Sequence, residues 1–159
     1  MRSSRLSWRS PATVLALSIA ILSVGLAGCA TSGTSAPPAV APAITDAWIR
    51  VPTGAGQQTA AYLTIANNGG ETEVLTAISS SGATGCTLHE TSMDSSGMAG
   101  MHMIDRLEIP GHGMVKLEPG GYHVMMEGVG SLKVGDKVEL SLTFQHAGVV
   151  KVMAEVRAG

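Results

Sequence analysis

Aromatic and charged side chains are both scarce in this sequence. Phe, Trp and Tyr together account for 3% of its 159 residues, and charged residues account for 14%. So few rings disfavour a surface on which bases or sugars stack. The formal net charge is −2, and three of the ten basic residues lie in the first ten positions. The rest of the chain is therefore acidic, offers no basic cluster to phosphates, and is expected to bind no nucleic acid.

The sequence also lacks the short motifs that many enzymes share. It contains no G-x-S-x-G elbow, no phosphate-binding P-loop and no dinucleotide fingerprint. The segment HETSM at 89–93 begins like the HExxH motif of zinc peptidases, but Met93 stands where the second His is required, and the segment does not look helical. We therefore do not expect an enzyme.

Long apolar runs are confined to one segment near the N-terminus. Residues 1–10 are basic and polar, and residues 12–24 are apolar and uncharged. This run is too short to span a bilayer, which needs about 20 residues, and the pattern is typical of an export signal. It leads into LAGC at 26–29, which resembles the bacterial lipobox, whose Cys is acylated. We predict a lipoprotein signal peptide at 1–28 and lipidation of Cys29, rather than a buried helix or an ordinary signal peptide with an incidental Cys.

The next segment, 29–43, continues from Cys29 with small residues and Pro, so it cannot bury a core and is predicted to be a flexible tether. We expect the chain to be exported and lipid-anchored at the outer face of the cytoplasmic membrane, or periplasmic. Residues 44–159 are predicted to form one domain. Its single cysteine, Cys86, then has no partner for an intramolecular disulfide. We expect Cys86 to be a small buried hydrophobe, with a direct metal role as the alternative.

The domain is predicted to be all-β, a Greek-key β-sandwich of about 7–9 short antiparallel strands. Short runs rich in Val, Ile, Leu and Thr recur between Gly, Pro, Asn and Asp turns, and no apolar pattern has helical period. In the run at 137–144 apolar and polar residues alternate, as in a sheet with one solvated face. The predicted strands are Ile44–Val51, Ala60–Ala66, Glu73–Ser79, Thr87–Glu90, Met101–Ile109, Met114–Leu117, Tyr122–Met126, Lys137–Phe144 and Val149–Val156.

Methionine and histidine are the residues of which this sequence has many. Seven of the nine Met lie between positions 93 and 126. On a strand, His123 and Met125 point to the same face, as do Met101 and Met103, with His102 on the other face. His89 is expected at the end of a strand, before a loop at 91–100 that brings these residues to one rim of the sandwich.

The residue types indicate the metal. Thioethers are soft neutral donors that favour Cu(I), and imidazole binds copper in both oxidation states. A site of two His and two Met has no thiolate for zinc and few carboxylates for calcium or magnesium. Methionine is also a common core residue, and we assign Met114, Met126 and Met153 to packing rather than to the metal.

The run from His89 to Met125 resembles the PCu(A)C family of periplasmic copper chaperones. The family signature is His, ten to eleven residues, Met, twenty-one residues, then His-x-Met. Here it is formed by His89, Met101, His123 and Met125, while Glu90 stands where some members have an additional Met. Flanking segments also match, namely Asp46–Arg50, Ala60–Ile65, Leu88–Glu90, Leu107–Pro110 and Leu117–His123.

The resemblance implies a cupredoxin-like sandwich that holds one Cu(I) near its surface. Members are linked to supplying copper to cytochrome c oxidase, so the implied partner is a copper acceptor such as its subunit II, or another copper chaperone. We expect a monomer that passes copper by ligand exchange, with the Met donors leaving early. Met98, His102 and Met103 are candidates for an auxiliary set of ligands.

Two other readings compete with the chaperone. A blue-copper electron carrier needs a Cys thiolate with two His and an axial Met, and Cys86 lies near His89 in sequence but with opposite strand parity. A lipid-anchored structural or copper-sequestering sandwich would have no transfer role.

Overall fold

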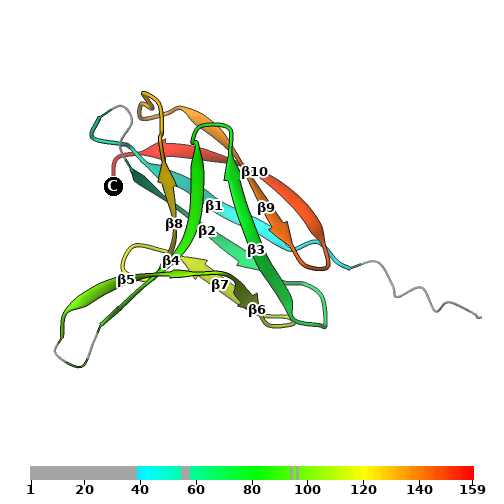
Figure 1. The fold of residues 1–159 in the computed structure, drawn as a ribbon. Coiled ribbons are helices and arrows are strands. Elements are labelled where there is room, and N and C mark those ends of the chain that lie inside the picture. The colour runs from blue at the N-terminus through cyan, green and yellow to red at the C-terminus, as the bar shows by residue number, and fades with distance from the viewer. Residues whose placement is uncertain (1–38, 55–57, 94, 96) are drawn as a thin grey trace, which may run out of the picture. The chain divides into compact units, whose positions relative to one another are not determined.

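A computed structural model describes residues 39–54, 58–93, 95 and 97–159, and the described chain is built from strands (Figure 1). The predicted signal peptide at 1–28, the lipidation of Cys29 and most of the tether lie outside these residues. Within the described part, no helix is long and apolar enough to cross a membrane. The strands are β1 Ala43–Arg50, β2 Thr59–Ala66, β3 Glu73–Ser80, β4 Gly85–Met93, β5 Ala99–Ile104, β6 Leu107–Ile109, β7 Met114–Leu117, β8 Tyr122–Glu127, β9 Lys137–Phe144 and β10 Gly148–Arg157.

The all-β prediction is confirmed, with two differences around the segment that carries the methionines. The predicted strand Met101–Ile109 is divided into β5 and β6 by a bend at the exposed residues Asp105 and Arg106. The predicted loop at 91–100 is wrong at both of its ends, since β4 continues to Met93 and β5 begins at Ala99. The two strands pair in register across this segment, so backbone hydrogen bonds that a loop would leave open are satisfied in a hairpin.

The strands form one sheet in the order β5-β4-β8-β7-β2-β1-β10-β9-β3-β6, in which β8 also pairs with β2. Most pairings are antiparallel, as predicted, but β1–β10 and β7–β8 are parallel. The sheet folds over so that β3 lies against β4 without pairing to it. Figure 1 shows the far end of the β4–β5 hairpin reaching beyond the other strands.

The core lies between the two layers and is filled by alternate residues of the strands. In β9 the apolar residues Val138, Leu140, Leu142 and Phe144 are all buried, whereas the residues between them are exposed or half-buried. Burying a large aliphatic side chain stabilises the fold by about 1.5–3 kcal/mol. The alternation seen in the sequence therefore marks the face of β9 that forms the core.

An irregularity in β1 positions the residues at its end. The register with β2 shifts between Thr45 and Trp48, and Asp46 adopts a positive φ of 52°. After this bulge Trp48 lies opposite Tyr62, and their rings are in contact in a tilted arrangement, with centroids 4.5 Å apart and planes 32° apart. The guanidinium of Arg50 then lies over the Tyr62 ring, 5.6 Å from its centroid. The bulge thus organises a Trp48–Tyr62–Arg50 stack at one end of the sandwich.

At the start of β3, the carboxylate of Glu73 stabilises the turn between β9 and β10 by hydrogen bonding to its backbone. Glu73 is 4% exposed and accepts hydrogen bonds from the backbone N–H groups of Val74, His146 and Ala147 at 2.8–3.0 Å. The Nδ1 of His146 lies 3.2 Å from the same carboxylate. Burial alone raises the pKa of Glu73, but these hydrogen bonds and the nearby His146 together lower it below its usual range.

Candidate metal centre

The two predicted imidazole ligands lie side by side on neighbouring strands. His89 on β4 is directly opposite His123 on β8, and directly opposite Met103 on β5. Residues opposite each other in an antiparallel pair point to the same face of the sheet. The two imidazole rings stack with centroids 5.7 Å apart and planes 27° apart. His89 is therefore in the middle of a strand rather than beside a loop, and strand pairing brings the histidines together.

The two predicted thioether ligands lie on the same face as the histidines. Met125 is opposite Thr87 on β4 and Ala60 on β2, while Met101 is opposite Thr91 on β4. These neighbours are small, so they leave space above the sheet into which the longer Met side chains reach. Small residues in the central strand thus allow side chains from β5 and β8 to approach each other across it.

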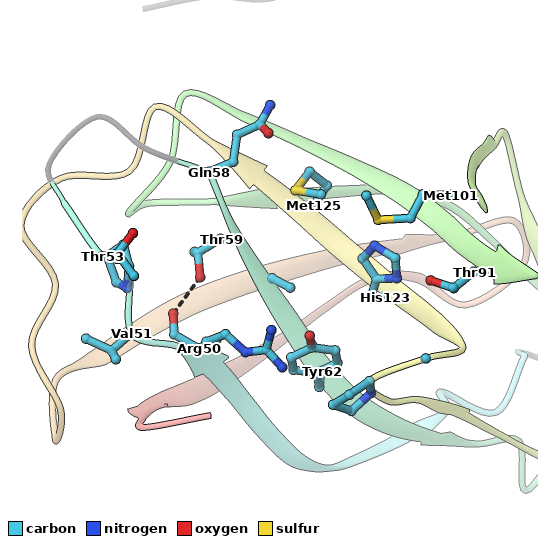
Figure 2. A pocket seen from close by; sticks show the side chains of 14 residues that line it. Arg50, Val51, Thr53, Gln58, Thr59, Tyr62, Thr91, Met101, His123 and Met125 are labelled. Atoms are coloured by element: carbon cyan, nitrogen blue, oxygen red, sulfur yellow. Dashed lines mark hydrogen bonds between the residues drawn. The ribbon is translucent and has the colours of Figure 1, made fainter. Parts of the chain in front are cut away.

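Three of the four residues border one open pocket of about 460 Å³. Figure 2 shows Met101 and Met125 above the His123 ring, with Thr91 beside them. His89 does not line this pocket, but its ring stacks on that of His123, which does. Within the described ranges, no three His, Cys, Asp or Glu side chains are grouped to hold a metal ion.

His123 has the hydrogen bond of a metal-binding imidazole. Its side chain is 5% exposed, and its Nδ1 lies 3.1 Å from the carbonyl oxygen of Gly121. Because a carbonyl only accepts, Nδ1 carries the proton and donates it, which leaves the lone pair of Nε2 for a metal. The turn at 118–121 supplies this carbonyl, and Gly120 adopts the positive φ of 85° that the turn requires.

His89 contains a buried nitrogen that has no hydrogen-bond partner among the described residues. Its Nε2 lies 3.0 Å from Oγ1 of Thr87, whereas its Nδ1 is buried and unsatisfied. A buried polar atom without a partner is costly, and a metal ion is one way to satisfy it. The pKa of His89 is lowered, mainly by burial and to a lesser extent by the nearby His123. The carboxylate of Glu127 has a smaller effect that raises it. The lowered pKa favours the neutral imidazole that metals require.

Arg50 and Tyr62 also border the pocket, and the sequence reasoning did not select them as site residues. Both lie in segments that match the PCu(A)C pattern, Asp46–Arg50 and Ala60–Ile65. That match was the only signal available, because Arg50 reaches the pocket after the bulge in β1 and Tyr62 lies on the neighbouring strand β2. A cation held over an aromatic ring forms a wall of the pocket opposite the thioethers.

The predicted auxiliary set is not brought together as a group. Met103 lies on the face of the histidines, but His102 is opposite Glu90 and points to the other face. Met98 precedes β5 and is 69% exposed.

The assignment of methionines to the core is correct for only one of the three residues. Met126 is fully buried, as predicted, whereas Met114 and Met153 are 58% and 54% exposed. Both exposed residues lie on strands outside the His–Met face, Met114 on β7 and Met153 on β10.

Cys86 does not share the face of the histidines. It is opposite the buried Met126 and is packed against the core, half-buried. Burial raises the pKa of its thiol, so the neutral form is favoured over the thiolate. A blue-copper site, which needs a thiolate beside two His, does not fit this arrangement.

Comparison with known proteins agrees with the fold and identifies the class of protein. Among solved structures, the solution structure of CuI-DR1885 from Deinococcus radiodurans is 31% identical, covers 80% of this chain and 84% of its own, and has a TM-score of 0.59. The copper-bound PCuAC domain from PmoF2 covers 73% of this chain and 92% of its own, with a TM-score of 0.61 at 24% identity, which supports the fold alone. The all-β sandwich and these matches assign the chain to the PCu(A)C class, and the predicted resemblance is confirmed.

A family model and a curated relative identify the family more closely. The model described as "Putative lipoprotein LpqE-like" matches residues 42–156. The chain belongs to this LpqE-like lipoprotein family. It is 28% identical over 148 residues to "Putative lipoprotein Lxx21020" of Leifsonia xyli subsp. xyli, an alignment that covers 89% of this chain and 88% of the relative.

Proposed function

We propose that this chain is an exported, lipid-anchored Cu(I) chaperone rather than an enzyme. The observation that carries the proposal is one face of the sheet on which His89 and His123 stack while Met101 and Met125 border the pocket beside them. Two imidazoles and two thioethers suit Cu(I) better than zinc, calcium or magnesium. The Cu(I) state named for DR1885 supports the choice of metal.

The hydrogen bonds of the histidines indicate which nitrogen atoms bind copper. With Nδ1–H of His123 donated to Gly121, its Nε2 is the copper ligand, and the buried Nδ1 of His89 is the complementary ligand. Both thioethers are neutral at every pH. They therefore bind Cu(I) without losing a proton, in contrast to thiols, which must first be deprotonated.

Release follows from the unequal exposure of the donors. Met101 is 60% exposed on an edge strand, whereas His123 is 5% exposed. A ligand from an acceptor protein reaches the copper from the side of Met101 and replaces that thioether first. The imidazoles keep hold of the ion until the acceptor has supplied several ligands, so transfer proceeds by stepwise exchange within a docked complex.

The acceptor that we propose is a copper protein of the same compartment, either subunit II of cytochrome c oxidase or a second copper chaperone. The family resemblance supports this choice. Outside the first ten residues the chain has seven basic and twelve acidic residues, given its totals of 10 and 12. An excess of acidic side chains favours encounter with a basic acceptor surface.

Anaerobic Cu(I) titration combined with X-ray absorption tests the ligand set. The wild type is expected to bind its first equivalent with mixed nitrogen and sulfur scattering. The double variant Met101→Leu, Met125→Leu is expected to lose the sulfur scattering and to bind Cu(I) at least about tenfold more weakly, a change of about 1.4 kcal/mol. The matched control is Met114→Leu, Met153→Leu, which removes two exposed thioethers from other strands. Equal loss in the control, or retained sulfur scattering in the first variant, would contradict the proposed site.

A transfer assay separates a chaperone from a copper-sequestering protein. The copper-loaded chain is mixed with an apo acceptor domain, and copper is measured on each protein over time. A chaperone transfers copper faster than the ion dissociates into a competing chelator. Transfer at only the dissociation rate would favour sequestration.

A further inference from the structure

The β4–β5 hairpin exposes thioethers that the proposed four-ligand site does not use. Met93 at the end of β4 is 75% exposed, and Met103 on β5 is 64% exposed. Methionine is usually buried, because its side chain is largely apolar. The two residues flank Met101, which is 60% exposed on the same hairpin.

The strand register places these three methionines on one face. Met101 is opposite Thr91 and Met103 is opposite His89, while Met93 is opposite Ala99. Positions 89, 91 and 93 of β4 alternate onto one face, and positions 99, 101 and 103 of β5 lie across from them on that face. Met93 is therefore the diagonal neighbour of Met101, within reach of a long side chain.

The residues between the methionines are small or soft. Ala99 and Thr91 occupy the positions opposite Met93 and Met101, so neither fills the space between the two thioethers. Positions 89, 91 and 93 of β4 and 99, 101 and 103 of β5 face this side of the hairpin, and none of them is a carboxylate. Glu90 is opposite His102 in the strand register, and both point to the other side of the hairpin. Such a surface offers nothing to hard cations, and its neutral sulfurs suit Cu(I).

We propose that Met93, Met101 and Met103 form an outer Cu(I) position made of thioethers alone, from which copper enters the inner His–Met site. This proposal rests on the proposed function, because it names how that site is filled. The outer position is weaker than the inner one, since it lacks the imidazoles. The far end of the hairpin reaches beyond the other strands (Figure 1), where a copper donor can approach it.

Met101 connects the two positions, because it is a ligand in both. Copper bound to Met93, Met101 and Met103 moves inward when its bonds to Met93 and Met103 break and bonds to His89, His123 and Met125 form. The ion remains Cu(I) throughout, so the step needs no electron. Each sulfur or nitrogen contributes a lone pair, and the total charge of the complex stays constant.

NMR of the methionine methyl groups tests the proposal independently of any transfer activity. The full chain is labelled with methyl-¹³C methionine, held in detergent micelles and titrated anaerobically with Cu(I) supplied as its acetonitrile complex. The first equivalent is expected to shift the methyl signals of Met101 and Met125. Further Cu(I) is expected to shift those of Met93 and Met103. If the signals of Met93 and Met103 stay in place beyond the first equivalent, the outer position does not exist.

Two double variants complete the test. Met93→Leu, Met103→Leu is expected to keep the first binding event, to lose the second, and to take Cu(I) from a bathocuproine-type chelator about tenfold more slowly. Met114→Leu, Met153→Leu removes two exposed thioethers elsewhere and is expected to keep both events. Loss of the second event in this control as well would overturn the proposal. An unchanged uptake rate in the first variant would overturn the entry role.

The same titration distinguishes failure of the outer position from failure of the proposed function. If the first equivalent leaves Met101 and Met125 unshifted, the inner site is not formed by these residues, and the outer position falls with it. If the first equivalent shifts both, the inner site stands whatever Met93 and Met103 do.

Discussion

Strands β9 and β5 both alternate apolar with other residues, yet they use the alternation in opposite ways. In β9 the apolar residues are buried under the second layer, and none of them is more than 6% exposed. In β5 Met101 and Met103 alternate in the same manner but are 60% and 64% exposed. A period of two therefore identifies a common face of the sheet, but it does not indicate whether that face is covered by protein or exposed to solvent.

The chemical nature of the apolar side chain makes this difference possible. Val, Leu and Phe in β9 gain only from removal from water, so their face is stable only when covered. The thioethers of β5 have in addition a lone pair that binds a soft metal ion. If the proposed copper site is correct, exposure of the thioethers in the hairpin serves metal binding, whereas exposure of the side chains in β9 would serve no such purpose.

The largest expected difference between β9 and β5 is the loss of stability when one apolar side chain of each strand is truncated. Leu142→Ala in β9 is expected to lower the free energy of unfolding by about 2–5 kcal/mol, because the side chain is fully buried and leaves a cavity. Met101→Ala in β5 is expected to change it by no more than about 0.5 kcal/mol, since its side chain is largely exposed. Urea unfolding of the copper-free proteins measures both. A loss of comparable size in Met101→Ala would mean that the hairpin face is part of the core.

The next largest effect is the pH-dependent contribution of Glu73 to stability in the body of the sandwich. The pKa of Glu73 is lower in the folded chain than in the unfolded chain, so its charge stabilises the fold above about pH 4.3. That stabilisation is lost as the pH falls through the lowered pKa. Glu73→Gln is expected to reduce the free energy of unfolding by about 1–3 kcal/mol at neutral pH, with the difference shrinking in acid. Unfolding in urea at a series of pH values measures this dependence.

Glu139 provides the control for that experiment. It pairs with Lys151 at 2.9 Å, but both side chains are substantially exposed. Glu139→Gln is expected to cost at most about 1 kcal/mol at neutral pH. A Glu73→Gln difference that does not vary with pH would show that the turn is held without the charge.

The smallest expected effect on stability tests the space above β4. Thr91→Ile enlarges the side chain that lies opposite Met101 and borders the pocket. We expect Cu(I) affinity to fall about tenfold, or about 1.4 kcal/mol, although no ligand has been changed. The free energy of unfolding should change by no more than about 0.5 kcal/mol. Chelator competition measures the affinity, and Thr64→Ile on β2, outside the pocket, is the matched control. Unchanged affinity in Thr91→Ile would mean that the thioethers do not meet above this strand.

Much of the fold could be predicted because its signals are local. Turns rich in Gly, Pro and Asn ended the strands where expected, and the alternation in 137–144 identified its buried face. The parallel pairings of β1 with β10 and of β7 with β8 were missed, because the sequence of a strand does not determine which strand it pairs with or in which direction. The strand at 101–109 was not divided either, since Asp105 and Arg106 are compatible with an exposed strand.

The site was predictable as a list of residues and less so as an arrangement. Strand parity correctly put His123 with Met125, and Met101 with Met103, on common faces. The stacking of His89 on His123 depends on the register between β4 and β8, which no local pattern encodes. The placement of Arg50 at the pocket depends on a bulge at Asp46. Aspartate tolerates a positive φ, but its presence in a strand sequence does not predict a bulge. The roles of the predicted ligands and of Cys29 stay predictions.

The path of β1 has a consequence for orientation. The strand starts at Ala43, where the preceding segment joins the sandwich, and ends at Arg50, which borders the pocket. Eight residues of extended chain separate those points by roughly 20 Å. Residues 39–42 therefore join β1 at the end away from the pocket, and none of these four residues lines it.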